Sequence, residues 1–529
     1  MDKQLSRSKL KAMNNSLVKT QRKLTKKIWL LLSLGIVVAF CVAFVLKAKE
    51  LTVPGWVVFE EKELVTGNGM GVTLSKGKVT IKDSKQDKTS TLIWTSGDDL
   101  RVQDILLSDL DSDGKEEVIA LVWKKGKYGN AMPFWVSQND TGISQHIFIY
   151  DIQNDGTTTQ KWFASDIGTE IRRMKLMEKN QTILLTETVE GDNDLWKWES
   201  FGLKNIRNEV RIVAFGDNII HREINEYANK AQKGNFDFLY EPFADEIGNA
   251  DIAVIQAETI LVDNESAVSG YPLFGSPLAV GEAIARAGFD VAVCGNNHAL
   301  DKGIYGVDVT TNFYNENGIT CIGIQNSSET AYEPYKLISR NGIRFALFSY
   351  TYGTNGIDIS DKYPNAVHYL PEINNEGSIV RNSDEISTVD SSENNRRNSD
   401  SSAENDIFSD IASARNEADI IIVFVHWGEE YDTEITPDQC YYADLFANAG
   451  ADVVIGTHPH VIQKMETVTR SDGNPMTIYY SLGNFRAYQG QTSDTRTGAE
   501  AILTFEHTYD GISLKNANIR ELDAFIKLQ

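Results

Sequence analysis

The chain has 529 residues, of which 41% are hydrophobic and 10% aromatic, and its formal net charge is −23. This length predicts roughly two to four folded units, and the apolar content allows real cores, so the bulk of the chain is globular. Nucleic acid would need a basic surface, so the acidic balance argues against it as a partner. Four Cys in so long a chain are no disulfide framework.

The first predicted element is a transmembrane helix over residues 28–46, from Ile28 to Leu46. These nineteen residues carry no charge and are long enough to cross a bilayer. Nine Lys/Arg and one acid lie in residues 1–27, which predicts a basic cytoplasmic tail and an extracellular C-terminal region. A cleaved signal peptide is the competing interpretation, but no small-x-small cleavage site follows the run. We therefore expect a single-pass protein of the cell membrane.

Residues 52–207 contain short alternating segments such as "KVTIKD" and "STLIWTS", which predict a β-rich extracellular domain. Within it, "DLDSDGKEE" offers carboxylates at alternate positions of a loop, namely Asp109, Asp111, Asp113 and Glu117. Such carboxylates can surround one hard cation, and the stretch resembles the Asp-rich loops of FG-GAP or VCBS-type propeller blades. Calcium binding and a plain Asx-rich turn without an ion both remain open.

From residue 208 to residue 522 continuous apolar strands alternate with helices, which predicts an α/β domain whose sheet is buried on both faces. Two of its helices have start and stop signals, which are Ser276, Pro277 and Gly288 for one and Thr436, Pro437 and Gly450 for the other. Residues 374–405 are nearly all Ser, Asn, Asp, Glu and Arg. This composition predicts a disordered surface insertion.

The predicted strands of the α/β domain end, one after another, in side chains that can bind metals. In chain order these are Asp217, Glu258, Asn297 with His298, His426, and His458 with His460. Ligands of open α/β sheets bind outside the carboxyl ends of the strands, so we expect these side chains to meet at one site. Half of the eight His of the chain stand at these positions, which is not expected by chance.

The mixture of imidazole nitrogen and carboxylate oxygen suits Mn, Fe, Zn or Co, and it suffices for one ion or for two that share a carboxylate. Two such ions can activate water and neutralise charge on an attacked phosphoryl or carbonyl group. The predicted reaction is therefore hydrolysis or transfer at an anionic centre. His298, beside Asn297, is the predicted proton donor to a leaving group, and Asp301 is the residue predicted to orient it.

The motifs "GD", "AE", "GNNHALDKG", "HWGEEY", "GTHPHVIQ" and "SLGNF" resemble, in this order, those of the CapA family. These are poly-γ-glutamate capsule synthesis proteins within the calcineurin-like metallophosphatase superfamily, and the resemblance covers residues 211 to about 490. It implies a four-layer α/β/β/α sandwich around a di-metal centre, with His298 as general acid. It further implies that one metal is held by Asp217 and His460, the other by Asn297, His426 and His458, and that Glu258 bridges them.

The sequence departs from the superfamily at two points. Ile219 stands where classical metallophosphatases have a His, two residues after the first Asp, and this leaves one metal site a ligand short. "IQAET" keeps the acid of the family's usual "NLE" and loses its amide.

Three functions remain open. The first is a membrane-anchored hydrolase or transferase of capsule biosynthesis that acts on an extracellular anionic polymer such as poly-γ-glutamate. The second is a phosphoesterase of nucleotides or phospho-glycans. The third is a non-catalytic subunit that binds polymer or positions a membrane synthase. The missing His at Ile219 favours the third function, whereas His298, which a scaffold does not need, favours the first two.

Overall fold

The computed structural model describes residues 53–83, 91–128, 136–138, 140–153, 155–164, 167–178, 182–371, 401–489 and 492–528. The predicted transmembrane segment 28–46 lies outside these residues, as does residue range 374–400 of the predicted insertion. Within the described ranges no helix is both long and apolar enough to cross a membrane. The chain divides into two compact units between Arg207 and Asn208.

The first unit is built from three consecutive four-stranded antiparallel sheets. Their strands are β1 (Lys62–Val65), β2 (Met70–Ser75), β3 (Lys78–Asp83) and β4 (Thr91–Thr95); β5 (Arg101–Ser108), β6 (Glu117–Lys125), β7 (Ile143–Ile152) and β8 (Thr158–Phe163); and β9 (Ile171–Glu178), β10 (Thr182–Thr188), β11 (Asn193–Glu199) and β12 (Gly202–Ile206). The middle sheet is buried on both faces because its strands alternate: Val118 packs toward the first sheet and Ile119 toward the third.

A mixed seven-stranded sheet forms one half of the second unit, in the order β18-β17-β14-β13-β26-β27, with β25 also paired to β13. Its strands are β13 (Glu209–Asn218), β14 (Ile252–Ala257), β17 (Val291–Val293), β18 (Thr320–Ile322), β25 (Asn484–Arg486), β26 (Thr497–Thr508) and β27 (Gly511–Asp523). The helices of this half are α2 (Arg222–Ala231), α3 (Ala244–Gly248), α4 (Leu278–Ala287) and α5 (Gly303–Glu316). The two-residue strands β15 (Leu261–Val262) and β16 (Ser276–Pro277) pair separately.

A six-stranded sheet forms the other half, in the order β19-β20-β21-β22-β24-β23. Its strands are β19 (Tyr335–Arg340), β20 (Ile343–Thr351), β21 (Ile420–His426), β22 (Val453–Thr457), β23 (Met465–Thr469) and β24 (Pro475–Tyr479), and its helices are α6 (Ser401–Glu417) and α7 (Pro437–Ala449). The strands β20, β21, β22 and β24 run parallel, as their continuous apolar sequences predicted.

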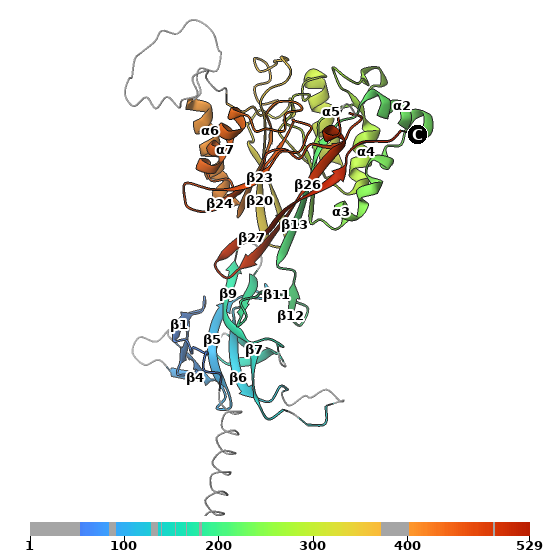
Figure 1. Cartoon of the computed structure of the whole chain (residues 1–529). Coiled ribbons are helices and arrows are strands. Elements are labelled where there is room, and N and C mark those ends of the chain that lie inside the picture. Colours follow the sequence, from blue (N-terminus) through green and yellow to red (C-terminus); the bar gives the residue numbers. More distant parts are fainter. Residues whose placement is uncertain are drawn as a thin grey trace, which may run out of the picture. The chain divides into compact units, whose positions relative to one another are not determined.

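The second unit has four layers, with helices on the outside and the two sheets face to face between them (Figure 1). Ile212 of β13 and Phe345 of β20 belong to one buried cluster between the sheets. Ile284 of α4 packs in a second cluster on the outer face of the seven-stranded sheet, and Phe446 of α7 in a third on the six-stranded sheet. This is the α/β/β/α layering that the family resemblance implied.

Two local predictions need correction. The predicted cap Ser276 lies buried in β16, and Pro277 is the residue that precedes α4. Helix α6 begins at Ser401, so residues 401–405 of the predicted insertion are helical, because they extend a helix that buries Ile411 further on. The predicted cap of α7 is confirmed by a capping box between Thr436 and Gln439.

Candidate metal centre

The carboxyl ends of strands from both sheets meet at one place in the second unit. The seven-stranded sheet contributes Asp217 near the end of β13, Glu258 directly after β14, and Asn297 in the turn after β17. The six-stranded sheet contributes His426 as the last residue of β21, with His458 and His460 after β22. Each of these six side chains is at most 3% exposed.

Contacts between the sheets join the six side chains. His460 Nδ1 lies 3.1 Å from Asp217 Oδ2, and the backbone N–H of His458 donates to the same oxygen over 3.1 Å. His426 Nε2 lies 3.0 Å from Asn297 Oδ1 and 3.6 Å from Glu258 Oε1. The residues that the sequence predicted as metal ligands are therefore in direct contact.

Several buried polar atoms at this place lack a hydrogen-bond partner among the described residues. They are Asp217 Oδ1, both carboxylate oxygens of Glu258 and His458 Nδ1. Leaving such atoms unpaired is costly unless a ligand satisfies them. Glu258 has a ligand atom within 4.8 Å of those of His426 and His458, and equally of those of Asp217 and His460. The donor set thus fits one or two divalent metals, with Glu258 in the bridging position.

Burial controls the charge of these groups. It raises the pKa of Glu258 well above its ordinary value, and the neighbouring Asp217 carboxylate raises it further. Burial also lowers the pKa of His426 and of His458 well below the usual value, so both imidazoles are neutral, the form that binds metals. A divalent cation between Asp217 and Glu258 would offset the repulsion between the two carboxylates.

The second nitrogen of His426 is held by neighbouring polar groups. Its Nδ1 lies 3.0 Å from Thr457 Oγ1 and 3.4 Å from Gln256 Nε2. Contacts of this kind fix the orientation of a ligating imidazole. The other nitrogen, Nε2, consequently faces Asn297 and Glu258.

His298 is positioned by Asp301. Its Nδ1 lies 2.7 Å from Asp301 Oδ2, which also accepts a 2.6 Å hydrogen bond from the backbone N–H of Phe274. The ring of Phe274 packs edge-on against the imidazole with 4.7 Å between centroids. Because Nδ1 is engaged by the carboxylate, Nε2 is the nitrogen left for a substrate.

Three residues at this place have a left-handed backbone conformation. His458 and His460 have φ values of 99° and 58°, and Tyr431 has 69°. Residues other than Gly rarely adopt this left-handed region, and such conformations persist where the surrounding structure enforces them. Tyr431 N–H donates to Pro459 O over 2.8 Å, which links the loop after β21 to the loop that carries both His.

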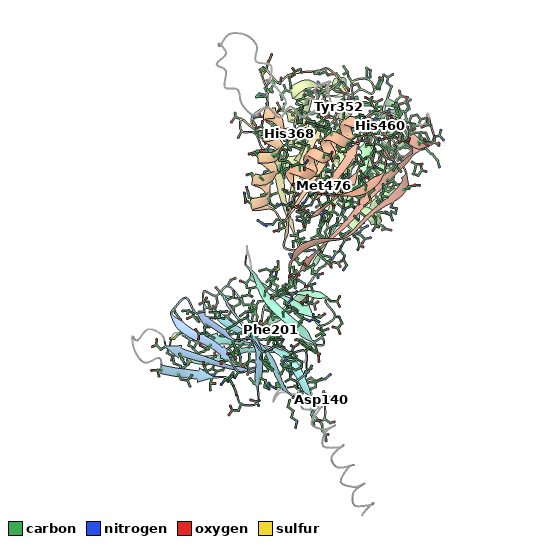
Figure 2. The ribbon with its side chains drawn as sticks, turned by 60° about the vertical axis from the view of Figure 1, so that its left-hand side comes forward. Asp140, Phe201, Tyr352, His368, His460 and Met476 are labelled. Atoms are coloured by element: carbon green, nitrogen blue, oxygen red, sulfur yellow. The ribbon has the colours of Figure 1, made fainter. Side chains whose placement is uncertain are left out.

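Sequence reasoning missed two neighbours of the centre. Glu430 is exposed, and its carboxylate lies within 4.8 Å of the ligand atoms of His458 and His460. The ring of Tyr352 lies 4.7 Å from that of His458, and Tyr352 and His460 lie at the same end of the second unit (Figure 2). The one signal for Glu430 was its place in "HWGEEY", four residues after a predicted ligand.

Ile219 cannot supply the ligand that the superfamily pattern places there. Its side chain is buried in a small apolar cluster with Phe274 and Ala487. His221 belongs to none of the groups of candidate ligands among the described residues, and its Nδ1 accepts a 3.2 Å hydrogen bond from the backbone N–H of Tyr488. Among the described residues, only Glu258 and His460 join Asp217 in its group of candidate ligands, one ligand fewer than the superfamily resemblance implies.

In the predicted calcium loop of the first unit, a lysine ammonium lies among the carboxylates. Ligand atoms of Asp109, Asp111, Asp113 and Glu117 come within 4.8 Å of one another. The ammonium of Lys161 lies 2.6 Å from Asp111 Oδ2 and 2.7 Å from Glu117 Oε1. Burial alone would lower the pKa of Lys161, but its carboxylate neighbours raise it above the ordinary value. An ammonium from β8 thus contacts two of the four predicted calcium ligands.

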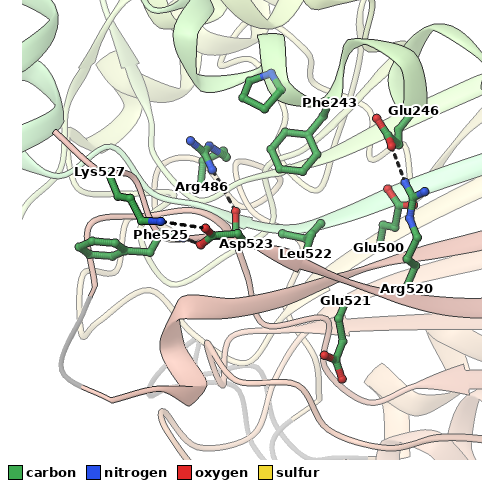
Figure 3. A pocket seen from close by; sticks show the side chains of 11 residues that line it. Phe243, Glu246, Arg486, Glu500, Arg520, Glu521, Leu522, Asp523, Phe525 and Lys527 are labelled. Carbon is green, nitrogen blue, oxygen red and sulfur yellow. Dashed lines mark hydrogen bonds and ion pairs between the residues drawn. The ribbon is translucent and has the colours of Figure 1, made fainter. Parts of the chain in front are cut away.

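A pocket of about 530 Å³ also lies in the second unit (Figure 3), and none of the predicted ligands lines it. Arg520 contacts Glu246 at 2.9 Å and Glu500 at 2.5 Å, and Lys527 faces Asp523 at 3.7 Å. These charges are paired with one another, whereas the ligand cluster at the strand ends has buried polar atoms without hydrogen-bond partners among the described residues.

The fold and the site together define a two-sheet α/β sandwich with a candidate metal centre between the strand ends. A family model described as "Bacterial capsule synthesis protein PGA_cap" matches residues 211–489, more than half of the chain. The chain therefore belongs to this family, and the resemblance to the CapA proteins is confirmed.

Two curated proteins and one solved structure illustrate the similarity. The PGA biosynthesis protein CapA of Bacillus subtilis (strain 168) is 29% identical over 224 residues, which is 42% of this chain and 48% of that protein. The capsule biosynthesis protein CapA of Bacillus anthracis is 26% identical over 249 residues, 45% of this chain and 50% of that protein. The chain thus matches about half the length of these relatives. The match to the calcineurin-like phosphoesterase YfkN from Bacillus subtilis covers 60% of this chain and 91% of that chain at 13% identity, with a TM-score of 0.32.

Proposed function

We propose that the second unit is a metal-dependent hydrolase or transferase that acts on an anionic cell-envelope polymer, such as poly-γ-glutamate, during capsule synthesis. Membership of the capsule synthesis family supports the pathway, and the name of the Bacillus subtilis relative supports PGA as the polymer. The observation that carries the enzymatic part is the pair of His298 and Asp301, 2.7 Å apart beside the ligand cluster. A protein that only binds polymer would not need an oriented imidazole there.

Each residue has a definite task in this proposal. Asp217, Glu258, Asn297, His426, His458 and His460 would hold the metal ions. When bound, divalent ions polarise a phosphoryl or carbonyl group and lower the pKa of water. His298 delivers a proton from Nε2 to the leaving group, while Asp301 holds Nδ1 and stabilises the imidazolium. The chain is strongly acidic, so the bound cations would also supply the positive charge that attracts an anionic substrate.

We further propose that residues 28–46 anchor the protein in the cell membrane with the metal centre outside, where capsule polymer is assembled. The uncharged run and the nine Lys/Arg of residues 1–27 support this topology. Membrane synthase subunits are then the expected protein partners.

An activity screen of the purified full-length chain tests the proposal. Poly-γ-glutamate, γ-glutamyl amides and phosphoesters would each be incubated with Mn²⁺ and, in parallel, with a chelator. We expect metal-dependent cleavage or chain transfer of the γ-glutamyl substrates. Turnover of phosphoesters alone would favour the phosphoesterase, and no turnover of any substrate would favour the non-catalytic scaffold.

A further inference from the structure

We infer that Glu430 is a ligand of the metal held by Asp217, Glu258 and His460, and that it supplies the donor that Ile219 cannot. The inference rests on the proposed metal centre and adds a residue to it. Glu430 belongs to neither the predicted ligand set nor the buried cluster, since its side chain is exposed to solvent.

The position of the Glu430 carboxylate is the first reason. One of its oxygens lies within 4.8 Å of a ligand nitrogen of His458 and of His460, a spacing at which a single ion can be shared. His460 in turn approaches Asp217 at 3.1 Å and Glu258 at 3.8 Å. Glu430 therefore lies on the solvent side of the same ligand group.

The construction of its loop is the second reason. Glu430 follows the buried ligand His426 by four residues and precedes Tyr431, whose backbone is left-handed with φ 69°. The hydrogen bond from Tyr431 N–H to Pro459 O fixes this loop against the "HPH" loop, between the two His. A strained residue that is tied down next to Glu430 indicates that the position of Glu430 is enforced.

The unmet need for a donor is the third reason. Asp217 Oδ1, the Glu258 oxygens and His458 Nδ1 are buried without hydrogen-bond partners in the described parts of the chain, and so face a place that needs a cation. Asn297, His426 and His458 together with the bridging Glu258 give one metal four ligands, whereas Asp217, His460 and Glu258 give the other only three. Glu430 would bring the second set to four.

Metal analysis of the full-length protein and two variants tests the inference. Wild type, Glu430→Gln and the neighbouring control Glu429→Gln would be loaded with Mn²⁺, dialysed and measured for bound metal, with affinity measured by chelator competition. We expect two equivalents in wild type and in Glu429→Gln, and one in Glu430→Gln, whose weaker site loses on the order of 10-fold or more in affinity. Melting in excess chelator should be the same for Glu430→Gln and wild type, which shows that the fold is intact.

The outcomes separate this inference from the proposed function. Two equivalents at wild-type affinity in Glu430→Gln would overturn the role of Glu430 and leave the metal centre in place. A wild-type protein that retains only one equivalent would overturn it as well. A wild-type protein that binds no divalent metal would overturn both the metal centre and the ligand role of Glu430.

Discussion

His460 and Asp217 come from different sheets, and yet the imidazole Nδ1 of one lies 3.1 Å from the carboxylate of the other. They are 243 residues apart in the chain, and both are buried. The two halves of the sandwich are thus joined at their strand ends by the same side chains that would bind metal. We therefore expect metal binding to stabilise the contact between the two sheets.

Removing metal should lower the stability of the second unit. Burial and the neighbouring Asp217 disfavour the ionised form of Glu258 when no cation is bound, because they raise its pKa. A metal at 100 times its Kd stabilises a folded protein by about 2.7 kcal/mol. We expect Mn²⁺ to raise the melting temperature of the full chain and a chelator to reverse the increase. Asp217→Asn should show a much smaller increase. An equal Mn²⁺ response in this variant would place the bound metal elsewhere.

The buried His368 predicts a loss of stability at mildly acidic pH. Burial lowers its pKa to about 4, while Nε2 contacts Gln325 Oε1 at 3.2 Å. The unfolded chain takes up this proton near pH 6.5 and the folded chain only near pH 4, so the free energy of unfolding falls as pH decreases through this range. At pH 5 the loss from this one group should be about 2 kcal/mol.

Urea unfolding of wild type and His368→Gln between pH 7 and pH 5 measures this contribution. The variant should lose less stability than wild type on acidification, because Gln does not titrate. Equal pH dependence in the two proteins would show that His368 is accessible to protons in the folded state.

The loop of Asp109 to Glu117 should be stabilised by Lys161 whether or not calcium is present. Asp111→Ala removes the carboxylate 2.6 Å from the Lys161 ammonium, and the expected loss is about 1 kcal/mol. The melting temperature of the first unit should fall equally in calcium and in chelator. Asp113→Ala is the matched control, because its exposed carboxylate contacts only backbone N–H of Lys115 among the described residues. A loss confined to calcium-containing buffer would mean that an ion, rather than Lys161, organises the loop.

The proposed membrane topology can be checked with a C-terminal reporter that functions only in the cytoplasm. The basic residues 1–27 should keep the N-terminus inside, so the reporter should be inactive in cells. An active reporter would reverse the orientation and place the candidate metal centre in the cytoplasm.

The ligand cluster was predictable because each member follows an apolar strand. Asp217, His426 and His458 stand where a buried run ends, and parallel strands bring such ends together. The ends of two helices were also predictable from Gly288 and Gly450, and both residues adopt the left-handed conformation that ends a helix. The structure brings these side chains together and ends both helices at the predicted Gly, because local sequence and tertiary position agree at these places.

The sequence could not reveal contacts that depend on distant or exposed residues. Lys161 is 44 positions from Glu117, and nothing in an alternating strand marks a Lys that turns toward a distant loop. Glu430 is a common surface residue in an exposed turn, and its place beside His460 arises from the backbone contact between two loops. The sequence also did not indicate that position 216 must be Gly. A Cβ there would lie 2.0 Å from the carbonyl oxygen of Gly483. In each case the partner belongs to another part of the chain.

Asn297 and His298 are adjacent in the chain but should have separable functions. Asn297 Oδ1 lies 3.0 Å from the ligand nitrogen of His426, so Asn297→Ala should reduce bound metal and activity together. Metal analysis alongside kinetics would detect this. Full metal content in Asn297→Ala would remove this residue from the ligand set.

The most direct test of the account is the turnover rate and metal content of His298→Asn with the best substrate from the screen. The variant should keep its fold and its bound metal and lose roughly 10²–10⁴-fold in rate, the usual contribution of a positioned general acid. The loss should be smaller for a substrate whose leaving group needs no proton. If His298→Asn instead loses its metal, His298 is a ligand and not the acid. If its rate equals that of wild type, the pair of His298 and Asp301 has no catalytic role, and the central claim is wrong.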